Sequence, residues 1–424
     1  MLPRLTAGLV CAVLLRGAIE AAEPPFAAAP SDATRSATWP GVPGVVIDHS
    51  PAASGLYIGS PGLAVWTNGD YLASHDFFGP KSEEHECPTV VVFRSADRGQ
   101  TWQPAARLRC LLWPSLFTHN GAVYLLGTDK HHGRLVIRRS VDGASTWSEP
   151  GDATTGLLTP SGSYHTAPVP VIVHRGRLWR AFEDASGGTA WGARYMAGVM
   201  SAPADADLLN AANWTFSGVL PRDPQWLRGQ FNGWLEGNVV VSRDGGVVNI
   251  LRVDTPSGPE KAAVVRVSAD GKSLNLDPAT GFVDFPGGAK KFTIRYDPPS
   301  DRYWSLTTVA SERLAQAVRP ATIRNTLALV YSPDLRNWTV RCILLYHPDV
   351  KRHGFQYVDW QFDGEDMIAV CRTAYEDGQG GAHNNHDANF LTFHRIGQFR
   401  TKTGTDPVAL WPTADQPTQP TVNP

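Results

Sequence analysis

The sequence contains little charge. Asp, Glu, Lys and Arg together make up 18% of its 424 residues, and the formal net charge at pH 7 is only −2. A sparse and balanced charge offers no surface for a polyanion, so nucleic acid is not expected as a partner. Cysteine is also scarce, and the spacings of the five cysteines match no zinc motif. We therefore predict neither a metal site nor a cofactor.

The chain begins with an apolar run that is too short to cross a bilayer. Residues 5–15, LTAGLVCAVLL, follow Arg4 and have the length of the apolar part of a secretion signal. Small residues come next in AIEAAEPP, which places the expected cleavage site near Ala21 or Ala22. We interpret residues 1–22 as a signal peptide and expect a secreted or periplasmic protein without stable membrane insertion. An ordinary apolar N-terminal helix is the alternative.

Removal of this segment takes Cys11 with it and leaves four cysteines. In an oxidising compartment Cys87 could pair with Cys110, or Cys342 with Cys371. Buried thiols are the alternative, because Cys342 and Cys371 both lie in apolar runs. None of the four is interpreted as a nucleophile.

Glycine, proline and tryptophan are abundant instead, with 40, 33 and 14 residues. Many short strands joined by tight turns give such a composition. One eight-residue turn, SADRGQTW at residues 95–102, follows the apolar run TVVVF and returns in variant form along the chain. The variants are SVDGASTW (140–147), SAPADADLLNAANW (201–214), SADGKSLNL (268–276) and SPDLRNW (332–338).

Hairpin signals recur upstream of these turns. Two apolar strands are joined by a tight turn at Asn68-Gly69, Asn120-Gly121, Arg175-Gly176, Asp244-Gly245, Ser300-Asp301 and Asp363-Gly364. Asn-Gly and Asp-Gly indicate hairpins because both accept positive φ at little cost. The first glycine-to-glycine steps are 52, 55 and 69 residues. Repeats of about this length, each holding three or four strands, are typical of β-propellers.

We predict six blades, at residues 57–103, 111–150, 164–218, 234–278, 291–340 and 355–400. The segment GVVIDH, residues 44–49, is expected to supply the outer strand that closes the ring with the last blade. The propeller would span residues 41–404, between flexible segments at 23–40 and 405–424. The repeated Ser/Asp turns are interpreted as structural, with side chains that satisfy backbone groups and a tryptophan that packs between blades.

The S-x-D-x-G-x-T-W pattern on six blades resembles the Asp-box, or BNR, repeat of the sialidase superfamily of glycoside hydrolases, over most of the chain. The resemblance implies an all-β fold, a six-bladed β-propeller of sialidase type. It also implies arginines that bind a substrate carboxylate and a tyrosine nucleophile that a glutamate activates.

Four residues match this site in order. Glu236 opens WLEGNVVVSRDGGVVNILR, and Arg252 follows 16 residues later, as the family's glutamate and second arginine do. Arg324 precedes SPDLRNW as the third arginine does, and Tyr357 in FQYVDWQFDG resembles the nucleophile. A phenol is a poor nucleophile at its ordinary pKa near 10, so an adjacent carboxylate must take its proton. The resemblance thus implies Tyr357 as nucleophile, Glu236 as its base, and Arg252 and Arg324 as ligands of an anionic group.

The sequence departs from the family at the first arginine. YIGSPGL keeps Pro61 but has Gly59 or Ser60 at the arginine position, so the sugar need not be sialic acid. The family's acid/base carboxylate belongs to blade one. Asp76 in SHDFFG, at the end of the second strand, is our preferred candidate, and KSEEHEC offers Glu83, Glu84, His85 and Glu86 on the next loop as alternatives.

Two polar clusters have no counterpart in the sialidase pattern. They supply Tyr164, His165 and Arg180 in blade three, and Arg372, His383, His386 and Asp387 in blade six. Polar residues crowded into a Gly-rich loop contribute little to a core, so we expect these seven to bind substrate. A metal site and a plain polar loop are the alternatives.

The sequence therefore predicts an exo-acting glycoside hydrolase for a terminal acidic or decorated sugar, with an oligo- or polysaccharide as its partner. A polysaccharide lyase is one alternative, in which Tyr164, His165, Arg180 and His386 would support β-elimination on a uronate. A glycan-binding propeller without catalysis is the other.

Overall fold

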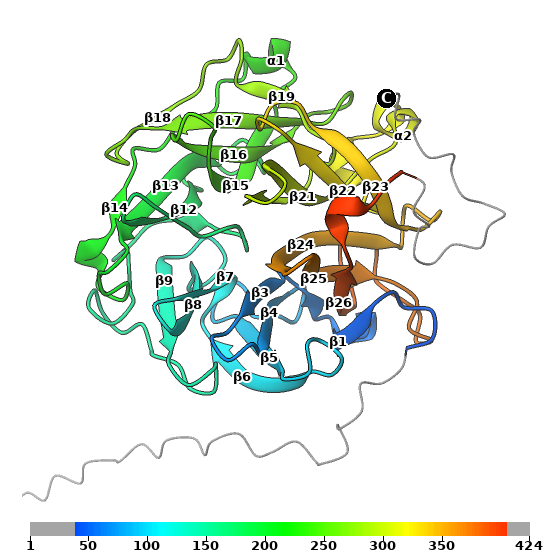
Figure 1. Ribbon diagram of the computed structural model, residues 1–424, viewed down its shortest axis with the longest axis horizontal. Coiled ribbons are helices and arrows are strands. Elements are labelled where there is room, and N and C mark those ends of the chain that lie inside the picture. The colour runs from blue at the N-terminus through cyan, green and yellow to red at the C-terminus, as the bar shows by residue number, and fades with distance from the viewer. Residues whose placement is uncertain (1–38, 405–424) are drawn as a thin grey trace, which may run out of the picture. The chain divides into compact units, whose positions relative to one another are not determined.

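Six antiparallel sheets surround a central axis in the computed structural model, which describes residues 39–404 (Figure 1). The predicted all-β, six-bladed β-propeller is confirmed. Helical structure in this part of the chain is confined to two short α-helices and four 3-10 turns. The predicted signal peptide at 1–22, most of the segment 23–40 and the tail 405–424 lie outside the described residues. No described helix is long and apolar enough to cross a membrane.

The first three blades follow the predicted hairpin turns. Blade one contains β2 (Tyr57–Ile58), β3 (Gly62–Val65), β4 (Tyr71–Phe78), β5 (Thr89–Ser95) and β6 (Gln103–Arg109). Blade two contains β7 (Leu112–His119), β8 (Ala122–Thr128) and β9 (Leu135–Ser140). Blade three contains β10 (Tyr164–His165), β11 (Ile172–His174), β12 (Arg177–Asp184), β13 (Met196–Pro203) and β14 (Thr215–Phe216).

The other three blades repeat this order. Blade four contains β15 (Gly233–Val241), β16 (Val247–Asp254), β17 (Lys261–Val267), β18 (Leu274–Asn275) and β19 (Phe282–Asp284). Blade five contains β20 (Thr293–Asp297), β21 (Arg302–Thr308), β22 (Thr326–Ser332) and β23 (Thr339–Tyr346). Blade six contains β24 (Gly354–Asp363), β25 (Asp366–Ala374), β26 (Phe390–Ile396) and β1 (Val45–His49). The helices are α1 (Trp226–Gly229) and α2 (Glu312–Ala317), with 3-10 turns at Ala52–Ser54, Ala211–Asn213, Pro320–Thr322 and Phe399–Thr401.

The N-terminal strand closes the ring, as predicted. β1 pairs antiparallel with β26 and becomes the outer strand of blade six. In Figure 1 the blue β1 lies beside the red β26, so the start and the end of the propeller share one sheet. This pairing protects the outer edge of β26 and links the first blade to the last.

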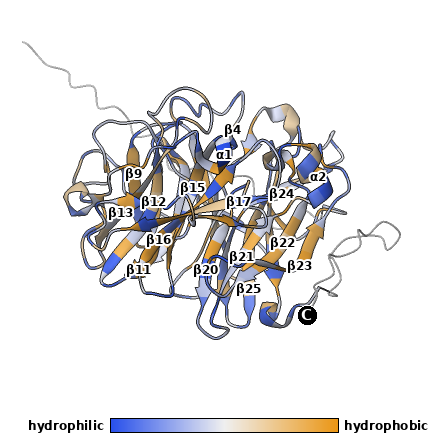
Figure 2. Cartoon of the chain, turned by 90° about the horizontal axis from the view of Figure 1, so that it is seen from above, coloured by the Kyte–Doolittle hydropathy of each residue, from blue (hydrophilic) through white to orange (hydrophobic). Residues whose placement is uncertain are grey.

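The hydrophobic core lies between neighbouring blades. Blades five and six share one cluster that contains Trp304, Phe355 and Trp360, and blades one and six share another. A middle strand such as β8 is buried along its whole length, because a blade inside the ring has a neighbour on both faces. Apolar residues accordingly gather along the strands in Figure 2, while many connecting loops are hydrophilic.

The Ser/Asp turns bind their own backbone. In the first turn Ser95 Oγ donates to Asp97 at 2.8 Å and accepts the Gly99 N–H at 2.8 Å. Asp97 also accepts the Thr101 N–H at 2.9 Å, and the buried Trp102 indole donates to the Gly99 carbonyl at 3.3 Å. The turn at residues 140–147 repeats these contacts. The structural role predicted for these side chains is therefore confirmed.

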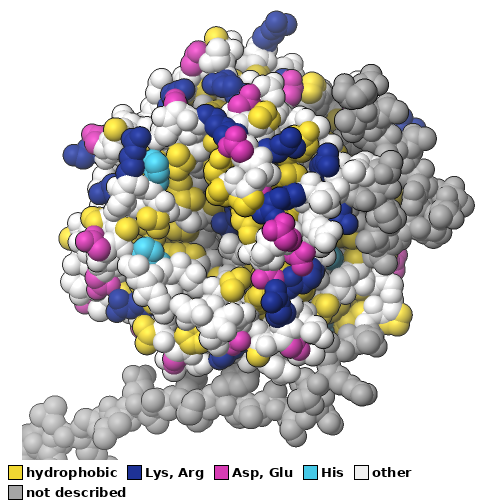
Figure 3. All heavy atoms as spheres, in the orientation of Figure 1, with side chains coloured by type: hydrophobic (Ala, Val, Ile, Leu, Met, Phe, Trp, Pro, Cys, Tyr) yellow, Lys and Arg dark blue, Asp and Glu magenta, His cyan; other side chains and the backbone are white. Residues whose placement is uncertain are grey.

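These turns lie at the end of the ring where inner strands finish. Strand direction alternates within a blade, so the third strands β5, β9 and β22 end where the first strands end. The opposite end holds the starts of the inner strands. Charges on the face shown in Figure 3 are of both signs and interspersed, without a broad patch of one sign.

Candidate active site

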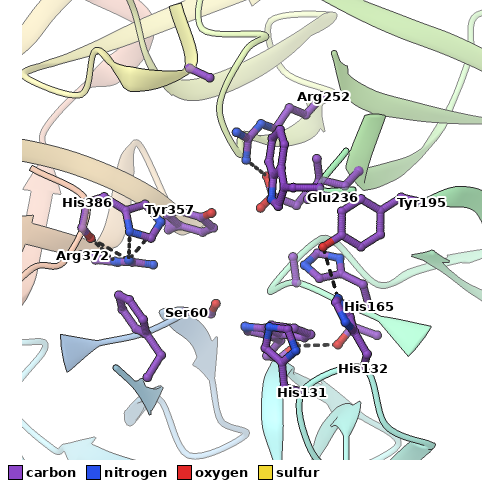
Figure 4. Close-up of a pocket in the computed structure, with 18 of the residues that line it drawn as sticks. Ser60, His131, His132, His165, Tyr195, Glu236, Arg252, Tyr357, Arg372 and His386 are labelled. Atoms are coloured by element: carbon purple, nitrogen blue, oxygen red, sulfur yellow. Dashed lines mark hydrogen bonds and ion pairs between the residues drawn. The ribbon is translucent and has the colours of Figure 1, made fainter. Parts of the chain in front are cut away.

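A cavity of about 630 Å³ opens at the end of the ring where the inner strands begin. Its volume falls within the range of small-molecule sites. Figure 4 shows Tyr357, Arg372 and His386 on one side and Tyr195, His132 and His165 on the other, with Glu236 and Arg252 between them. Blades one to six all contribute residues, so the cavity lies on the axis of the propeller.

Three inner strands carry a β-bulge at the edge of this cavity. β7, β15 and β24 each shift register close to their first residues. At each shift one residue takes a left-handed φ: Trp113 at 52°, Glu236 at 58° and Tyr357 at 54°. Such φ values are strained for bulky residues and persist only where the surroundings enforce them. A bulge re-aims the side chain out of the strand's alternation, and all three side chains line the cavity.

Each bulge is held by a buried charged side chain from the preceding blade. Burial and these contacts together fix a backbone conformation that the strands alone would not adopt. The three contacts are Asp76 to the Trp113 N–H at 2.6 Å, Glu183 to the Gly237 N–H at 3.0 Å, and Lys291 to the Val358 carbonyl at 2.8 Å.

Glu236 and Arg252 form a buried ion pair across two adjacent strands. Glu236 Oε2 and Arg252 Nη1 are 3.0 Å apart, and both side chains are almost fully buried. Burial alone would raise the pKa of Glu236, but Arg252, aided by His165 and Arg324, outweighs it and holds this pKa below its ordinary value. Glu236 is therefore ionised at neutral pH. In Figure 4 the hydroxyl of Tyr357 points towards Glu236 across the cavity.

Two further arginines flank Tyr357 without an acidic partner. The guanidinium carbons of Arg372 and Arg324 lie 4.7 and 5.8 Å from the centroid of the tyrosine ring. Arg324 donates to Gln356 Oε1, and Arg372 donates from Nε to the His386 carbonyl at 3.1 Å. Burial lowers the pKa of Arg324 to about 10 and also lowers that of Arg372, so both remain cations at neutral pH. Neither forms an ion pair with a carboxylate of residues 39–404.

The uncompensated charge of these two groups favours an anionic ligand. A buried cation needs a partner to offset its desolvation, and guanidinium groups bind carboxylates through charge-assisted hydrogen bonds. We call Glu236, Arg252, Arg324, Tyr357 and Arg372 the cationic half of the cavity. Arg319 also lines the cavity but is paired with Asp254 through two hydrogen bonds of 2.8 and 2.5 Å.

The other side of the cavity is a group of rings that we call the ring wall: Trp113, His131, His132, His165 and Tyr195. Trp113 lies 4.8 Å from His131 and 4.5 Å from His165 between ring centroids, and His165 lies 5.1 Å from Tyr195. Burial, with repulsion from neighbouring histidines and Arg194, lowers the pKa of His131 to about 4 and that of His132 to about 3. Burial also raises the pKa of Tyr195. These three side chains are therefore uncharged at neutral pH.

Glu84 lies where the ring wall meets blade one. Its side chain lines the cavity, and its carbonyl accepts the His131 N–H at 2.7 Å. Burial raises the pKa of Glu84 more than the Gly79 N–H and His85 lower it. The Cys87–Cys110 disulfide, one of the two predicted pairings, anchors the loop that carries Glu84.

The second predicted pairing does not form. Cys342 and Cys371 are buried in the cluster between blades five and six. Burial raises the pKa of the Cys371 thiol to about 12.

Asp76, our preferred acid/base residue, lies beneath the cavity instead of lining it. Its two carboxylate oxygens accept the backbone N–H groups of Ser60 and Trp113, and its side chain is buried. Burial raises its pKa against the effect of these hydrogen bonds. A Cβ atom at Gly59 would lie 1.8 Å from Asp76 Oδ1, so a larger residue at position 59 would clash with Asp76. Asp76 therefore holds the backbone of Ser60 and Trp113 in place beside the cavity.

Arg180 is another predicted substrate ligand that lies outside the cavity. It is fully buried, and its donors already bind Ser115 and the carbonyls of Leu126, Ala167 and Ala181. Burial lowers its pKa to about 9. The sequence could not show that its guanidinium group points into the blade.

Three more predicted ligands lie just outside the lining. Tyr164 packs against Phe182 at 5.7 Å between ring centroids, and the exposed His383 stacks on Tyr57 at 5.3 Å. Asp387 accepts from His386 Nδ1 at 2.7 Å and so orients a histidine that does line the cavity. Tyr357, Glu236, Arg252, Arg324, Arg372, His165 and His386 are the predicted residues that the structure brings together there.

Comparison with solved structures finds the same fold in several glycoside hydrolases. A Hadza microbial sialidase, Hz136, has a TM-score of 0.58 at 14% identity, over 84% of this chain and 69% of the other. A leech intramolecular trans-sialidase has a TM-score of 0.54 at 12% identity, over 84% of this chain and 70% of the other. The α-L-arabinofuranosidase Arb93A of Fusarium graminearum has a TM-score of 0.54 at 11% identity, over 84% of this chain and 98% of the other. No protein-family model and no curated protein matches the sequence.

The chain has the fold of the sialidase-like propellers. The predicted resemblance to that superfamily is thus confirmed for the fold, which these neighbours share at low identity. The neighbours include enzymes named for sialic acid and enzymes named for arabinose.

Several lining residues had no place in the sequence prediction: Trp113, His131, His132, Trp191, Arg194, Tyr195 and Arg319. The His131-His132 pair in DKHHG follows β8 of blade two. Trp113 lies near the start of β7, the inner strand of the same blade, as Glu236 lies near the start of β15. Their positions beside the ends of these strands were the feature of the sequence that could have predicted them in the site. The exposed Trp191 lies over Arg252 and Arg319, with its ring centroid 5.4 and 4.9 Å from their guanidinium carbons.

One group of described residues has the composition of a metal site, His347, His353 and Glu376. The two imidazole rings stack with centroids 3.4 Å apart and an interplanar angle of 16°. Lone pairs in nearly parallel rings do not converge on one point, whereas a zinc ion requires converging ligands. His353 Nε2 also contacts Glu376 Oε2 directly at 2.7 Å. We assign no metal to this group.

Proposed function

We propose that the protein is a glycoside hydrolase that removes a terminal anionic sugar from a glycan. The observation that carries the proposal is the setting of Tyr357. Its ring lies beside the buried and uncompensated Arg324 and Arg372, and its hydroxyl faces the ionised Glu236. A neutral nucleophile suits an anionic sugar, because a carboxylate nucleophile would repel it.

In the first step the Tyr357 oxygen attacks the anomeric carbon while Glu236 takes the phenol proton. The glycosidic carbon–oxygen bond breaks, and the leaving oxygen takes a proton from Glu84. Glu84 suits this role because burial raises its pKa and its side chain lines the cavity. Arg252 keeps Glu236 ionised and oriented through the 3.0 Å contact.

In the second step a water molecule attacks the anomeric carbon of the tyrosyl-bound sugar. The Glu84 carboxylate accepts a proton from the water, and the Tyr357 oxygen leaves and recovers its proton from Glu236. Two displacements at one carbon retain its configuration. Arg324 and Arg372 bind the carboxylate of the sugar in both steps.

The proposed substrate is an acidic sugar because the cavity is lined by five arginines, Arg194, Arg252, Arg319, Arg324 and Arg372, and by two carboxylates, Glu84 and Glu236. The sialidase neighbours support this class, and the arabinofuranosidase neighbours do not. Gly59 or Ser60 stands in place of an arginine, which leaves the acidic sugar open to a uronic acid as well as a sialic acid.

The test is hydrolysis of a panel of sialic acid, uronic acid and neutral glycosides, with reducing ends and absorbance near 235 nm recorded together. We expect reducing ends without absorbance from an acidic glycoside. Tyr357→Phe and Glu236→Gln should each lower kcat by about 10³-fold or more, since both act in one unit. Tyr331→Phe, which removes a hydroxyl outside the cavity, is the matched control.

A rise in absorbance with cleavage would contradict the proposal and indicate a lyase. The lyase alternative relies on Tyr164, His165, Arg180 and His386, and two of these, Tyr164 and Arg180, do not line the cavity. Tight binding of an acidic glycan with no cleavage would indicate the non-catalytic alternative. Export from the cytoplasm remains part of the proposal, and the Cys87–Cys110 disulfide supports it.

A further inference from the structure

We propose that His75 is a positioning residue that, as a buried cation, ties the strand that closes the ring to the backbone beside the cavity. Its side chain contacts β1 on one side and the Asp76 carbonyl on the other. Closure of the propeller and the shape of its cavity then depend on one buried proton. The inference goes beyond the proposed function and does not depend on it.

His75 lies on β4, and no part of its side chain is exposed. Its Nδ1 contacts the Asp76 carbonyl oxygen at 2.9 Å, and its Nε2 contacts Asp48 Oδ2 on β1 at 2.8 Å. A carbonyl and an ionised carboxylate can only accept hydrogen bonds, so each ring nitrogen must donate one. An imidazole that donates from both nitrogens carries a positive charge. The two contacts therefore require a buried imidazolium.

These contacts connect two distant parts of the molecule. Asp48 belongs to β1, which closes the ring on blade six. The Asp76 carbonyl also accepts the Gly59 N–H at 2.7 Å, and the Asp76 carboxylate accepts the Trp113 N–H at 2.6 Å. Gly59 and Trp113 both line the cavity. A single side chain, that of His75, thus links the closing strand to the backbone that shapes the cavity.

The charged groups around His75 come from three elements. Asp48 on β1 pairs with it directly, and Asp76 follows it on β4. Burial raises the pKa of Asp76, whereas His75 and Arg372 on β25 lower it. Two phenylalanine rings, with centroids 4.8 and 5.9 Å away, pack against the imidazole. A buried charge that loses its partner destabilises the folded state, so the charge of His75 holds Asp48 and β1 in place.

Loss of one proton from His75 would break this arrangement. A neutral imidazole keeps one N–H, so either Asp48 or the Asp76 carbonyl would then face a lone pair. The hold on β1 is complete while His75 carries both protons and weakens as pH rises through the value at which it loses one. Imidazole is the side chain that changes charge in the range around neutral pH.

Two other histidines lie against β1 and do not need a charge. His49 Nε2 contacts Asp377 Oδ2 at 3.0 Å, and a neutral imidazole satisfies this contact with its one N–H. His394 lies against Gly44, and burial lowers its pKa to about 4, so it is neutral above that pH. A weakening of β1 above neutral pH is therefore assigned to His75.

The experiment measures the proton and the strand separately between pH 5.5 and 9. NMR with ¹⁵N-histidine labelling reports whether both nitrogens of His75 are protonated, with the signals assigned by their absence from His75→Gln. Hydrogen exchange with mass spectrometry reports the protection factor of the β1 amides. We expect both nitrogens to be protonated at pH 5.5 and β1 protection to fall about 10-fold as His75 deprotonates. Protection of β17 in blade four should stay constant.

Asp48→Asn is the decisive variant, because the side chain of Asp48 is 28% exposed and asparagine has the same size. An asparagine amide can donate to a neutral imidazole, so His75 no longer needs its second proton. We expect His75 to deprotonate at lower pH in this variant and β1 protection to lose its pH dependence. His49→Gln, on the same strand, is the matched control and should keep that dependence.

The cavity end is tested by the Trp113 amide signal under ¹⁵N-tryptophan labelling, which we expect to shift with the same midpoint as His75. A Trp113 signal that does not move as His75 titrates would overturn the link to the cavity. A singly protonated His75 at pH 5.5, or one that keeps both protons at pH 9, would contradict the proposal. Constant β1 protection in the wild type, or a pH dependence that survives in Asp48→Asn, would contradict it as well.

Discussion

The two sides of the cavity are both buried and polar, yet they handle charge in opposite ways. In the cationic half, Arg324 and Arg372 keep their charge, although burial lowers the pKa of both. On the ring wall, burial and mutual repulsion remove the charge of His131 and His132. A guanidinium group cannot lose its proton near neutral pH, whereas an imidazole can. A buried arginine therefore remains charged and can bind an anionic ligand, whereas a buried histidine becomes neutral.

The arginines of the cavity also differ in whether they pair with a carboxylate of the protein. Arg252 is matched by Glu236 and Arg319 by Asp254, so their charges are compensated within the protein. Among the described residues, Arg324 donates to Gln356 and Arg372 to His386, and neither pairs with a carboxylate. Under the proposed function, Arg252 and Arg319 hold carboxylates of the protein in place, and Arg324 and Arg372 bind the carboxylate of the substrate.

The largest expected effect is a difference in kcat between variants of two blade-one carboxylates, Glu84 and Asp76. Glu84→Gln removes the proposed acid, and we expect kcat for a glycoside with a poor leaving group to fall by about 10²- to 10⁴-fold. Asp76→Asn removes one acceptor from the backbone that carries Ser60 and Trp113, and we expect only about a 10-fold loss. The measurement is kcat over pH 3–8 on methyl and nitrophenyl glycosides, which differ in their need for a proton.

Glu84→Gln should spare the nitrophenyl glycoside, because nitrophenolate leaves without a proton. Asp76→Asn should affect both substrates alike and leave the shape of the pH profile unchanged. If Asp76→Asn instead abolishes the methyl reaction and flattens the pH profile, then Asp76 is the acid, and the positioning role assigned to it is wrong.

A smaller effect should distinguish the compensated from the uncompensated arginines. Arg324→Met and Arg372→Met each remove a charged donor to the substrate carboxylate, and a hydrogen bond to a charged group contributes about 1.5–3 kcal/mol. We expect kcat/KM for the acidic glycoside to fall about 10- to 100-fold. Arg336→Met, in a Ser/Asp turn that does not line the cavity, is the control for loss of one charge.

The same two variants should gain stability or keep it, because each removes a buried cation that lacks an acidic partner. Urea unfolding measures this. A loss of stability comparable to the loss of activity would mean that Arg324 and Arg372 support the fold, and the comparison between the two kinds of arginine would fail.

Much of the fold could be predicted from the sequence because its determinants are local. A turn such as SADRGQTW binds its own backbone, and hairpin turns such as Asn68-Gly69 need only residues that accept positive φ. Glu236, Arg252 and Tyr357 were predicted from the resemblance to sialidases, which their order and spacing along the chain carry, and all three line the cavity. Strand β1 was predicted to close the ring because the last blade needed an outer strand.

The remainder of the site depends on contacts between blades. The bulge at Trp113 requires Asp76, 37 residues earlier, and nothing near either residue in the sequence indicates the pairing. Asp76 was predicted in the site because it ends a strand, and Arg180 because it belongs to a polar cluster of blade three. Backbone groups of blade two bind both side chains instead. The pair His131 and His132 comes from blade two and Tyr195 from blade three, and only the ring brings them together.

The smallest expected effect concerns the pH dependence of stability on the ring wall. Unfolded histidine titrates near pH 6.5, whereas the folded protein holds the pKa of His131 at about 4 and that of His132 at about 3. Between those values the unfolded chain binds more protons, so the free energy of unfolding falls as pH falls from 6.5. We expect the double variant His131→Gln/His132→Gln to lose less stability than the wild type between pH 6.5 and 4, as measured by urea unfolding.

The double variant is needed because His131 lowers the pKa of His132. His85, His165 and Arg194 lower the pKa of both, and replacing His131 alone would let His132 titrate at a higher pH. His383→Gln is the control, since that side chain is 56% exposed and is not among the groups that lower the pKa of His131 or His132. If the free energy of unfolding falls equally with pH in the double variant and the wild type, then protonation of His131 and His132 does not destabilise the folded protein. The contrast with the cationic half would then rest on Arg324 and Arg372 alone.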